Sequence, residues 1–241
     1  MESNKNDKAV LLIHGYTGSP NEMEYLAERI HRDNNLSVYL PRLPGHGTNK
    51  EDFCQSNAED WLRKVYDSYL NLKSNYKEVY VGGLSMGALL AILTANKFQT
   101  EKLFLIAPAL YAHSKLLAFT PLAKYFLASM KNKYKNKDKY ETEEEKHLYE
   151  HYWKVHYTRQ AAELNKLMKL TRKRLTSITS DTLIICSPID EQVPMKAAYK
   201  IEKEISSKNK KLVILENSPH VINNGPEKEE CAEHVLKFLL A

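Results

Sequence analysis

The sequence predicts an α/β fold in which a mostly parallel central sheet carries helices on both faces and a small helical insertion. Short, continuous apolar runs alternate with segments of helical period along most of the chain, a pattern typical of parallel sheets. The run at residues 9–13 lacks polar positions and is therefore expected to be buried on both faces of the sheet. The alternation stops over residues 113–175, where a helical composition without a strand pattern indicates the insertion.

Each predicted strand is a short apolar run, and turn or helix-start residues follow it. We expect strands at residues 9–13, 36–40, 79–83, 103–106, 182–186 and 211–215. Helices are expected at residues 19–33, 57–72, 86–97, 194–206 and 226–240. The first helix begins with Ser19 as its N-cap, Pro20 at the first helical position and Glu22 as the acid of a capping box.

The chain of 241 residues suits one domain with an insertion. Residues 1–112 and 176–241 are expected to form the core that contains the sheet, and residues 113–175 a helical cap over one edge of the sheet. Residues 131–139 are rich in Lys and Asn and are expected to form a solvated loop. The alternative for this segment is a weak patch for anionic lipid surfaces.

Composition excludes several classes of protein. The formal net charge of +5 is small and spread along the chain, whereas a nucleic-acid binder usually has a stronger, clustered excess. Cys54, Cys186 and Cys231 form neither a disulfide framework nor a zinc-ligand pattern. The polar N-terminus does not fit a signal peptide, and no apolar stretch approaches the ~20 residues that span a bilayer. We therefore expect a cytoplasmic protein with no nucleic-acid partner and no stable membrane insertion.

The segment around Ser85 has the features of a reactive serine on a sharp turn. Ser85 lies between a predicted strand and a predicted helix, in Gly83-Leu84-Ser85-Met86-Gly87. The two small glycines let strand and helix approach, and the turn projects the serine hydroxyl toward a substrate carbonyl. Because a hydroxyl is a weak nucleophile without a base, a histidine and a carboxylate are needed beside it. An ordinary glycine-rich loop is the alternative interpretation.

His220 and Asp190 are the best candidates for that base and that carboxylate. Each follows a predicted strand, and in open α/β sheets the functional residues gather beyond the carboxyl ends of the strands. The chain order serine, acid, histidine also fits a nucleophile carried on a strand-to-helix turn. His113 is the alternative base and Glu191 the alternative acid. The structural alternatives are a surface or helix-capping His220 and an Asp190 that only caps the following helix.

Two backbone N–H groups are expected to bind a developing oxyanion. One belongs to Met86 at the start of the helix after Ser85, and the other to Tyr16 in the loop after the first strand. A plain turn is the alternative for the Tyr16 loop. Cys186 is expected to fill the core rather than act as a second nucleophile. The chain contains no HExxH, P-loop or GxGxxG pattern, so no metal and no organic cofactor is inferred.

Five motifs together make the chain resemble the small bacterial carboxylesterase and monoacylglycerol-lipase family, over its whole length except the insertion. They are His14-Gly15-Tyr16-Thr17-Gly18, Pro44-Gly45-His46-Gly47, Gly83-Leu84-Ser85-Met86-Gly87, Asp190-x-x-Val193-Pro194 and Ser218-x-His220. The resemblance implies an α/β-hydrolase core under a small helical cap, with the serine, acid, base and oxyanion roles named above. Ser187 and Pro219 stand where that family often has glycine, and Pro219 stiffens the loop of the expected base.

The expected activity is hydrolysis of carboxylic esters with short to medium acyl chains, including monoacylglycerols, through an acyl-enzyme on Ser85. A thioesterase, a peptidase or a carbon–carbon-bond hydrolase would use the same machinery, and a non-catalytic ligand-binding α/β-hydrolase is the alternative from another class. The expected partner is a small-molecule ester or lipid; weak contact with a lipid surface, the physiological substrate and the oligomeric state stay open. Some apolar side chains of the insertion are expected either to roof an acyl pocket or to pack the cap onto the core: Leu116, Leu117, Phe119, Leu122, Tyr125, Phe126 and Leu127.

Overall fold

The computed structural model describes residues 7–132 and 142–241. Among these residues, six strands form one sheet in the order β2-β1-β3-β4-β7-β8, and every neighbouring pair is parallel. The strands are β1 (Lys8–Ile13), β2 (Ser37–Tyr39), β3 (Glu78–Leu84), β4 (Lys102–Ile106), β7 (Asp181–Cys186) and β8 (Lys210–Ile214). The prediction of a mainly parallel sheet is confirmed, and all six predicted strands lie within a residue or two of their expected bounds.

The central strands are buried on both faces, as their uninterrupted apolar sequences require. In β1, Val10 and Leu12 join one core cluster while Leu11 and Ile13 join the other, and all four side chains are fully buried. Successive side chains of a strand point to opposite faces, so a strand between two helical layers has no place for a polar residue. The register sets Ile13 beside Gly83, which brings the carboxyl ends of β1 and β3 together.

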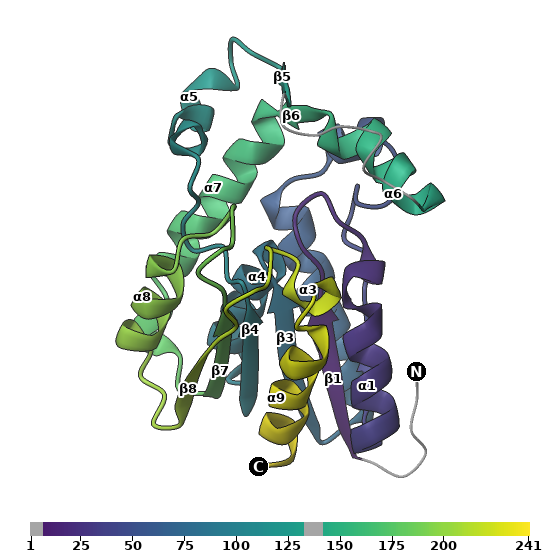
Figure 1. Ribbon diagram of the computed structural model, residues 1–241, viewed down its shortest axis with the longest axis vertical. Helices are drawn as coiled ribbons and strands as arrows, with labels where there is room; N and C mark the ends of the chain where they lie inside the picture. Colours follow the sequence, from purple (N-terminus) through teal and green to yellow (C-terminus); the bar gives the residue numbers. More distant parts are fainter. Residues whose placement is uncertain (1–6, 133–141) are drawn as a thin grey trace.

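Helices cover both faces of the sheet (Figure 1). On one face α1 packs against α9, and on the other α3, α4 and α8 contribute to the larger core cluster. The helices of the core are η1 (Pro20–Met23), α1 (Glu24–Asn34), α2 (Lys50–Gln55), α3 (Ala58–Asn75), α4 (Met86–Phe98), η5 (Leu175–Ser177), α8 (Lys196–Glu204), η6 (Ile222–Asn224) and α9 (Lys228–Leu240). The expected helices are present, and the six-residue α2 is an addition that its short length hid from the periodicity.

The described parts of the segment 113–175, residues 113–132 and 142–175, lie above the carboxyl ends of the strands (Figure 1). Its elements are η2 (Lys115–Phe119), α5 (Thr120–Ala123), β5 (Ser129–Lys131), α6 (Glu143–Leu148), the π-helix η4 (Tyr149–Trp153), β6 (Val155–Tyr157) and α7 (Thr158–Arg172). The expectation that it holds no strand is wrong, because β5 and β6 pair antiparallel. Strands of three residues are too short to show an alternating pattern. Most of the expected loop, residues 133–139, lies outside the described residues.

One half of this segment, α6 and η4, is fastened to the core by hydrogen bonds. The buried Tyr152 hydroxyl donates to the Gly45 carbonyl (3.0 Å) and accepts the Thr48 N–H (2.8 Å). The Trp153 indole N–H donates to the Thr17 carbonyl (3.1 Å). These bonds seat α6 and η4 directly on the loops that follow β1 and β2.

The other half, around η2 and α5, presents apolar side chains to solvent. Leu117 packs against the larger core cluster, so the expected packing onto the core holds for this side chain. Six of the seven apolar residues named for this region are exposed: Leu116, Phe119, Leu122, Tyr125, Phe126 and Leu127. No helix in the described ranges is long and apolar enough to cross a membrane.

Candidate active site

Ser85 lies on a sharp turn between β3 and α4, in a backbone conformation that side chains rarely adopt. Its φ of 56° and ψ of −113° fall outside the usual regions for a residue with a Cβ. The Ser85 N–H donates to the Ile106 carbonyl at the end of β4 (2.9 Å), and the Ser85 carbonyl accepts the Ala109 N–H (3.2 Å). These bonds tie the strained residue to the neighbouring strand, so the turn is held in place.

The glycines that flank Ser85 are required by close approach. A Cβ on Gly83 would lie 2.3 Å from the carbonyl carbon of Gly87, and a Cβ on Gly87 would lie 2.1 Å from the carbonyl oxygen of Ile13. No real Cβ contact is that short, so a side chain at either position would push α4 away from the sheet. Gly83 and Gly87 therefore allow the strand and the helix to approach each other, as the sequence predicted.

Ser85, His220 and Asp190 form one chain of hydrogen bonds, although 135 and 30 positions separate the bonded pairs. The Ser85 Oγ lies 2.8 Å from His220 Nε2, and His220 Nδ1 lies 2.7 Å from Asp190 Oδ2. A carboxylate only accepts hydrogen bonds, so Nδ1 carries the imidazole proton and Nε2 is the acceptor for the Ser85 hydroxyl. All three side chains are buried. This arrangement can remove the serine proton as the oxygen attacks a carbonyl carbon.

Asp190 is held by its own loop as well as by His220. Its Oδ1 accepts the N–H groups of Gln192 (2.8 Å) and Val193 (2.9 Å), which leaves Oδ2 for the imidazole. The carboxylate thus caps the following turn and also orients His220. The alternative acid Glu191 is exposed, and its neighbour Asp190 occupies the buried position that faces His220.

The loop that carries His220 is stiff and anchored. Pro219 precedes the histidine, and the buried Ser218 hydroxyl donates to the Glu227 carboxylate (2.5 Å). The same carboxylate accepts the Asn217 N–H (2.9 Å). The departure from glycine at position 219 is therefore compatible with an imidazole directed at Ser85. His113, the alternative base, is exposed, and its backbone N–H donates to the Gln192 carbonyl in the loop that carries Asp190.

The loop after β1 lies beside the serine. A Cβ on Gly15 would lie 3.6 Å from the Ser85 Cβ, so the Gly15–Tyr16 peptide is next to the nucleophile. No hydrogen bond to the Tyr16 N–H is found among the residues that the structure describes. The Met86 N–H lies in the first turn of α4, where a helix offers no internal partner. Both groups expected to bind an oxyanion are thus brought to the serine.

Glu22 has a different role from the one the sequence predicted. Its carboxylate accepts the Gly15 N–H (3.0 Å), so it supports the loop after β1 rather than closing a capping box. Burial raises the pKa of Glu22 to about 7, against the opposing influence of the Gly15 N–H and of His220. Ser19 and Asn21 of the same turn both donate to Glu144 of α6. The sequence contained no signal for these contacts, because they depend on how the loop folds back onto η1.

His14 and His46 are buried beside this loop. Burial lowers the pKa of His14 to about 4 and that of His46 to about 3, with the neighbouring His14 lowering the latter further. Both imidazoles are therefore neutral near pH 7. The His46 ring contacts the aromatic rings of Tyr16 and Trp61. These two histidines stand outside the chain of hydrogen bonds at Ser85.

The cysteine nearest the acid loop and the potential metal ligands do not form a second reaction centre among the described residues. Burial raises the pKa of the Cys186 thiol to about 12, so this sulfur stays protonated and is a poor nucleophile. No group of three His, Cys, Asp or Glu side chains within the described ranges could hold a metal ion. The chemistry that the site can perform therefore centres on Ser85.

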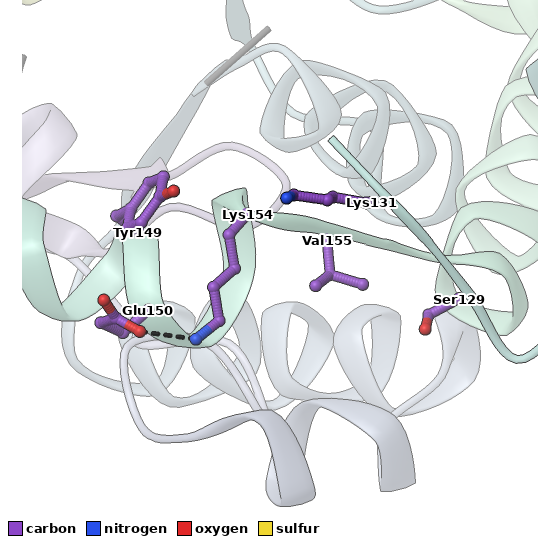
Figure 2. Close-up of a pocket in the computed structure, with 6 residues that line it drawn as sticks. All are labelled: Ser129, Lys131, Tyr149, Glu150, Lys154 and Val155. Atoms are coloured by element: carbon purple, nitrogen blue, oxygen red, sulfur yellow. Dashed lines mark hydrogen bonds and ion pairs between the residues drawn. The ribbon is translucent and has the colours of Figure 1, made fainter. Parts of the chain in front are cut away.

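A pocket of about 570 Å³ lies on the segment 113–175 rather than at the serine. Figure 2 shows its lining, with the ion pair between Glu150 and Lys154 (2.5 Å) on one side. The six lining residues come from β5, η4, β6 and the residue between the last two: Ser129, Lys131, Tyr149, Glu150, Lys154 and Val155. None of them belongs to the loops that carry Ser85, Asp190 or His220, so this pocket is not the place where the serine acts.

The chain is similar to known bacterial proteins over nearly its whole length. It is 33% identical over 235 residues to the thermostable monoacylglycerol lipase of Bacillus sp. (strain H-257). This alignment covers 95% of this chain and 89% of that protein. It is 26% identical over 234 residues to a carboxylesterase of Bacillus subtilis (strain 168), covering 97% of this chain and 92% of that one.

Solved structures agree on the fold. A structure reported for the metagenome-derived lipolytic enzymes LipS and LipT superposes with a TM-score of 0.87 at 30% identity, covering 100% of this chain and 96% of that one. The monoacylglycerol lipase of Paleococcus ferrophilus has a TM-score of 0.78 at 18% identity, covering 99% and 96%. Residues 4–227 match the family described as serine aminopeptidase, S33. The chain therefore belongs to the serine aminopeptidase S33 family, and its fold is that of an α/β-hydrolase lipase or esterase.

Proposed function

We propose that this protein hydrolyses carboxylic esters of short to medium acyl chains, with Ser85 as nucleophile, His220 as general base and Asp190 as the carboxylate that orients it. The observation that carries the proposal is the chain of hydrogen bonds from Ser85 through His220 to Asp190, at 2.8 and 2.7 Å. The similarity to a monoacylglycerol lipase and a carboxylesterase supports an ester as the substrate. The family itself supports a serine hydrolase.

The geometry suggests a two-step reaction. The Ser85 Oγ attacks the ester carbonyl carbon while His220 Nε2 takes the serine proton, and Asp190 stabilises the imidazolium that results. The carbonyl oxygen becomes an oxyanion, which the N–H groups of Tyr16 and Met86 bind. When the C–O bond breaks, the imidazolium gives its proton to the leaving alcohol and the acyl group stays on Ser85. Water then attacks the carbonyl carbon of the acyl-enzyme while His220 takes a proton from it. The bond between the Ser85 Oγ and the acyl carbon breaks, the imidazolium returns its proton to the Ser85 Oγ, and the carboxylic acid leaves.

We also propose that residues 113–175 act as a cap over the site, with residues 1–112 and 176–241 as the hydrolase core. The seating of α6 and η4 on the loops after β1 and β2 supports this division, since Trp153 contacts Thr17 in the loop that carries Tyr16. In α7, Leu167 and Met168 join the larger core cluster, so this helix is packed onto the core.

Two finer assignments complete the proposal. The exposed apolar side chains of η2 and α5, together with Lys124 and Lys131, suit a weak contact with lipid surfaces that carry the substrate. The cysteines of the chain, Cys54, Cys186 and Cys231, are free thiols, which is typical of a reducing compartment such as the cytoplasm.

The proposal is tested by removing the hydroxyl of Ser85. We expect Ser85→Ala to fold normally, to lose labelling by a fluorophosphonate probe and to lose at least about 1,000-fold in ester hydrolysis, as serine knockouts of such triads do. Ser68→Ala is the matched control, because Ser68 is a buried serine of α3 whose hydroxyl bonds only within its helix. Retained activity in Ser85→Ala would identify another nucleophile and sink the assignment.

The substrate class is tested on the wild-type enzyme. We expect p-nitrophenyl and glycerol esters to be cleaved fastest at short to medium chain length, with lower kcat/KM for palmitoyl esters. Matched thioesters and aminoacyl p-nitroanilides are the comparison, because the same triad serves all three reactions. A higher kcat/KM on the aminoacyl anilides than on the esters would replace the esterase proposal with a peptidase.

A further inference from the structure

The His14 side chain contacts the peptide that is proposed to bind the oxyanion. His14 Nδ1 lies 2.9 Å from the carbonyl oxygen of Gly15. That carbonyl belongs to the same peptide unit as the N–H of Tyr16. Because a peptide unit is planar and trans, fixing its oxygen also fixes the direction in which its N–H points.

The bonding partners of His14 determine which of its nitrogens carries the proton. The Leu43 N–H donates to His14 Nε2 (3.1 Å), and a backbone N–H can only donate, so Nε2 is unprotonated. A neutral imidazole has a single N–H, which must then be on Nδ1 and donates to Gly15. His14 is almost fully buried, at 1% exposure, and burial holds its pKa near 4. The ring therefore keeps this tautomer at neutral pH.

Neighbouring contacts hold the preceding peptide unit, between His14 and Gly15, and the same Gly15 carbonyl. The Glu22 carboxylate accepts the Gly15 N–H (3.0 Å), and the Gly18 N–H makes a longer bond to the Gly15 carbonyl (3.4 Å). Leu43 belongs to the loop after β2, so His14 also links two loops at the carboxyl edge of the sheet. The Gly15 carbonyl next to Ser85 thus accepts two hydrogen bonds, and the one from His14 is the shorter.

We propose that His14 is a positioning residue for the oxyanion hole: its Nδ1–H bond to the Gly15 carbonyl directs the Tyr16 N–H at the substrate oxygen. This inference rests on the proposed function. His14 is not expected to contact the substrate or Ser85. Substituting it should therefore destabilise the transition state and have little effect on substrate binding.

The test compares two substitutions at His14. His14→Phe removes both hydrogen bonds, and we expect kcat on a p-nitrophenyl ester to fall by about 10-fold or more, with KM within about twofold; loss of a complete oxyanion donor costs about 100- to 1,000-fold. His14→Asn keeps a donor near the Nδ1 position and is expected to recover most of the lost kcat. His46→Phe is the matched control, because His46 is equally buried beside the same loop but bonds to Pro44 instead of Gly15. We expect its kcat to stay within about twofold of wild type.

A second measurement separates an oxyanion effect from general damage. A trifluoromethyl ketone that adds to Ser85 places its own oxyanion in the hole, so its affinity should fall in His14→Phe by the same factor as kcat/KM. Unchanged ketone affinity, or a kcat in His14→Phe within about twofold of wild type, would overturn the role of His14. Should His14→Phe fail to fold, the ¹⁵N spectrum of the wild-type imidazole decides: a proton on Nε2 of His14 would refute the argument.

These outcomes are distinguishable from failure of the proposed function. If wild type hydrolyses esters and Ser85→Ala does not, the triad stands whatever the His14 variants do. If Ser85→Ala stays active, the nucleophile is wrong and the ketone no longer reports on this hole.

Discussion

Ser85 occupies a backbone conformation that a residue with a Cβ adopts only at an energetic cost. At φ 56° and ψ −113°, the strain is on the order of 1–3 kcal/mol. The surrounding bonds from Ile106 and Ala109 hold the residue there. The turn is thus stabilised by its neighbours and not by its own preference, as expected where a side chain must project toward a substrate.

This strain predicts that Ser85→Gly is more stable than Ser85→Ala. Both variants lack the hydroxyl and are expected to be inactive, so they differ only in the Cβ. Glycine adopts positive φ freely, and this relief should outweigh its entropy cost of roughly 0.5–1 kcal/mol, giving a net gain of about 1 kcal/mol. Urea unfolding of the two variants measures the difference. An alanine variant as stable as the glycine variant would show that the turn is not strained.

The buried His46 should make the folded protein less stable in acid. Burial lowers its pKa from 6.5 to about 3 in the folded state, so the unfolded chain binds a proton that the folded chain does not. Stability is therefore complete above pH 6.5 and declines as pH falls toward the folded pKa. Its Nε2 also has no hydrogen-bond partner among the described residues, so a proton there would gain no bond.

The variant His46→Phe removes this titration while keeping an aromatic ring in the cluster with Tyr16 and Trp61. Wild type should lose more stability than the variant when the pH is lowered. We therefore expect the free energy of unfolding of the variant, measured relative to that of wild type, to be higher at about pH 4.5 than at about pH 7.5 by about 2 kcal/mol or more. Urea titrations at both pH values give the comparison. A pH-independent difference between variant and wild type would mean that the folded His46 titrates as freely as the unfolded one.

The proposed triad could be predicted from the sequence because each member follows a strand with a strong apolar pattern. Ser85, Asp190 and His220 are found by position, and parallel strands bring their carboxyl ends to one edge of the sheet. The support of the loop after β1 could not be predicted in this way. Glu22 carries a helix-start signature, but its carboxylate bonds to Gly15, a contact set by the path of a loop that has no periodic pattern.

Among the elements, the strands of the core were predictable and those of the cap were not. β3 and β4 are apolar runs bounded by turns, whereas β5 and β6 are three residues each and only partly buried or exposed. A half-exposed three-residue strand is determined by its partner strand and not by its own side chains. The π-helix η4 could not be predicted either, because contacts of Tyr152 and Trp153 with the core determine it and not a local sequence pattern.

The described parts of the proposed cap form two unlike halves. The half with α6 and η4 is fastened to the loops after β1 and β2 by partly buried hydrogen bonds. The half with η2 and α5 makes few such bonds and exposes large apolar side chains. The exposed half is the one that we propose to contact a lipid surface.

Exposed apolar side chains are found at both ends of the molecule, but they are more numerous at one end than at the other. The η2 and α5 region lies at the top of Figure 1, where Leu122 is 69% and Phe126 86% exposed, and the C-terminus lies at the bottom, where Leu240 is 69% exposed. Leu122 and Leu240 are therefore equally accessible but far apart. Since exposed apolar groups that cluster mark contact surfaces while single ones are common, the two ends should behave differently toward a lipid surface.

We expect the double variant Leu122→Ser, Phe126→Ser to bind phosphatidylglycerol-containing vesicles at least about 10-fold more weakly than wild type, since burying each apolar side chain contributes about 1.5–3 kcal/mol. Added salt should weaken the wild-type binding, because Lys124 and Lys131 lie beside these side chains in the sequence. Sedimentation with vesicles measures the partition, and hydrolysis of a water-soluble ester checks that the site is intact. Leu240→Ser is the matched control. Two outcomes would contradict the proposal that the η2 and α5 region contacts lipid. One is equal vesicle binding by the double variant and wild type, and the other is an equal loss of vesicle binding in Leu240→Ser.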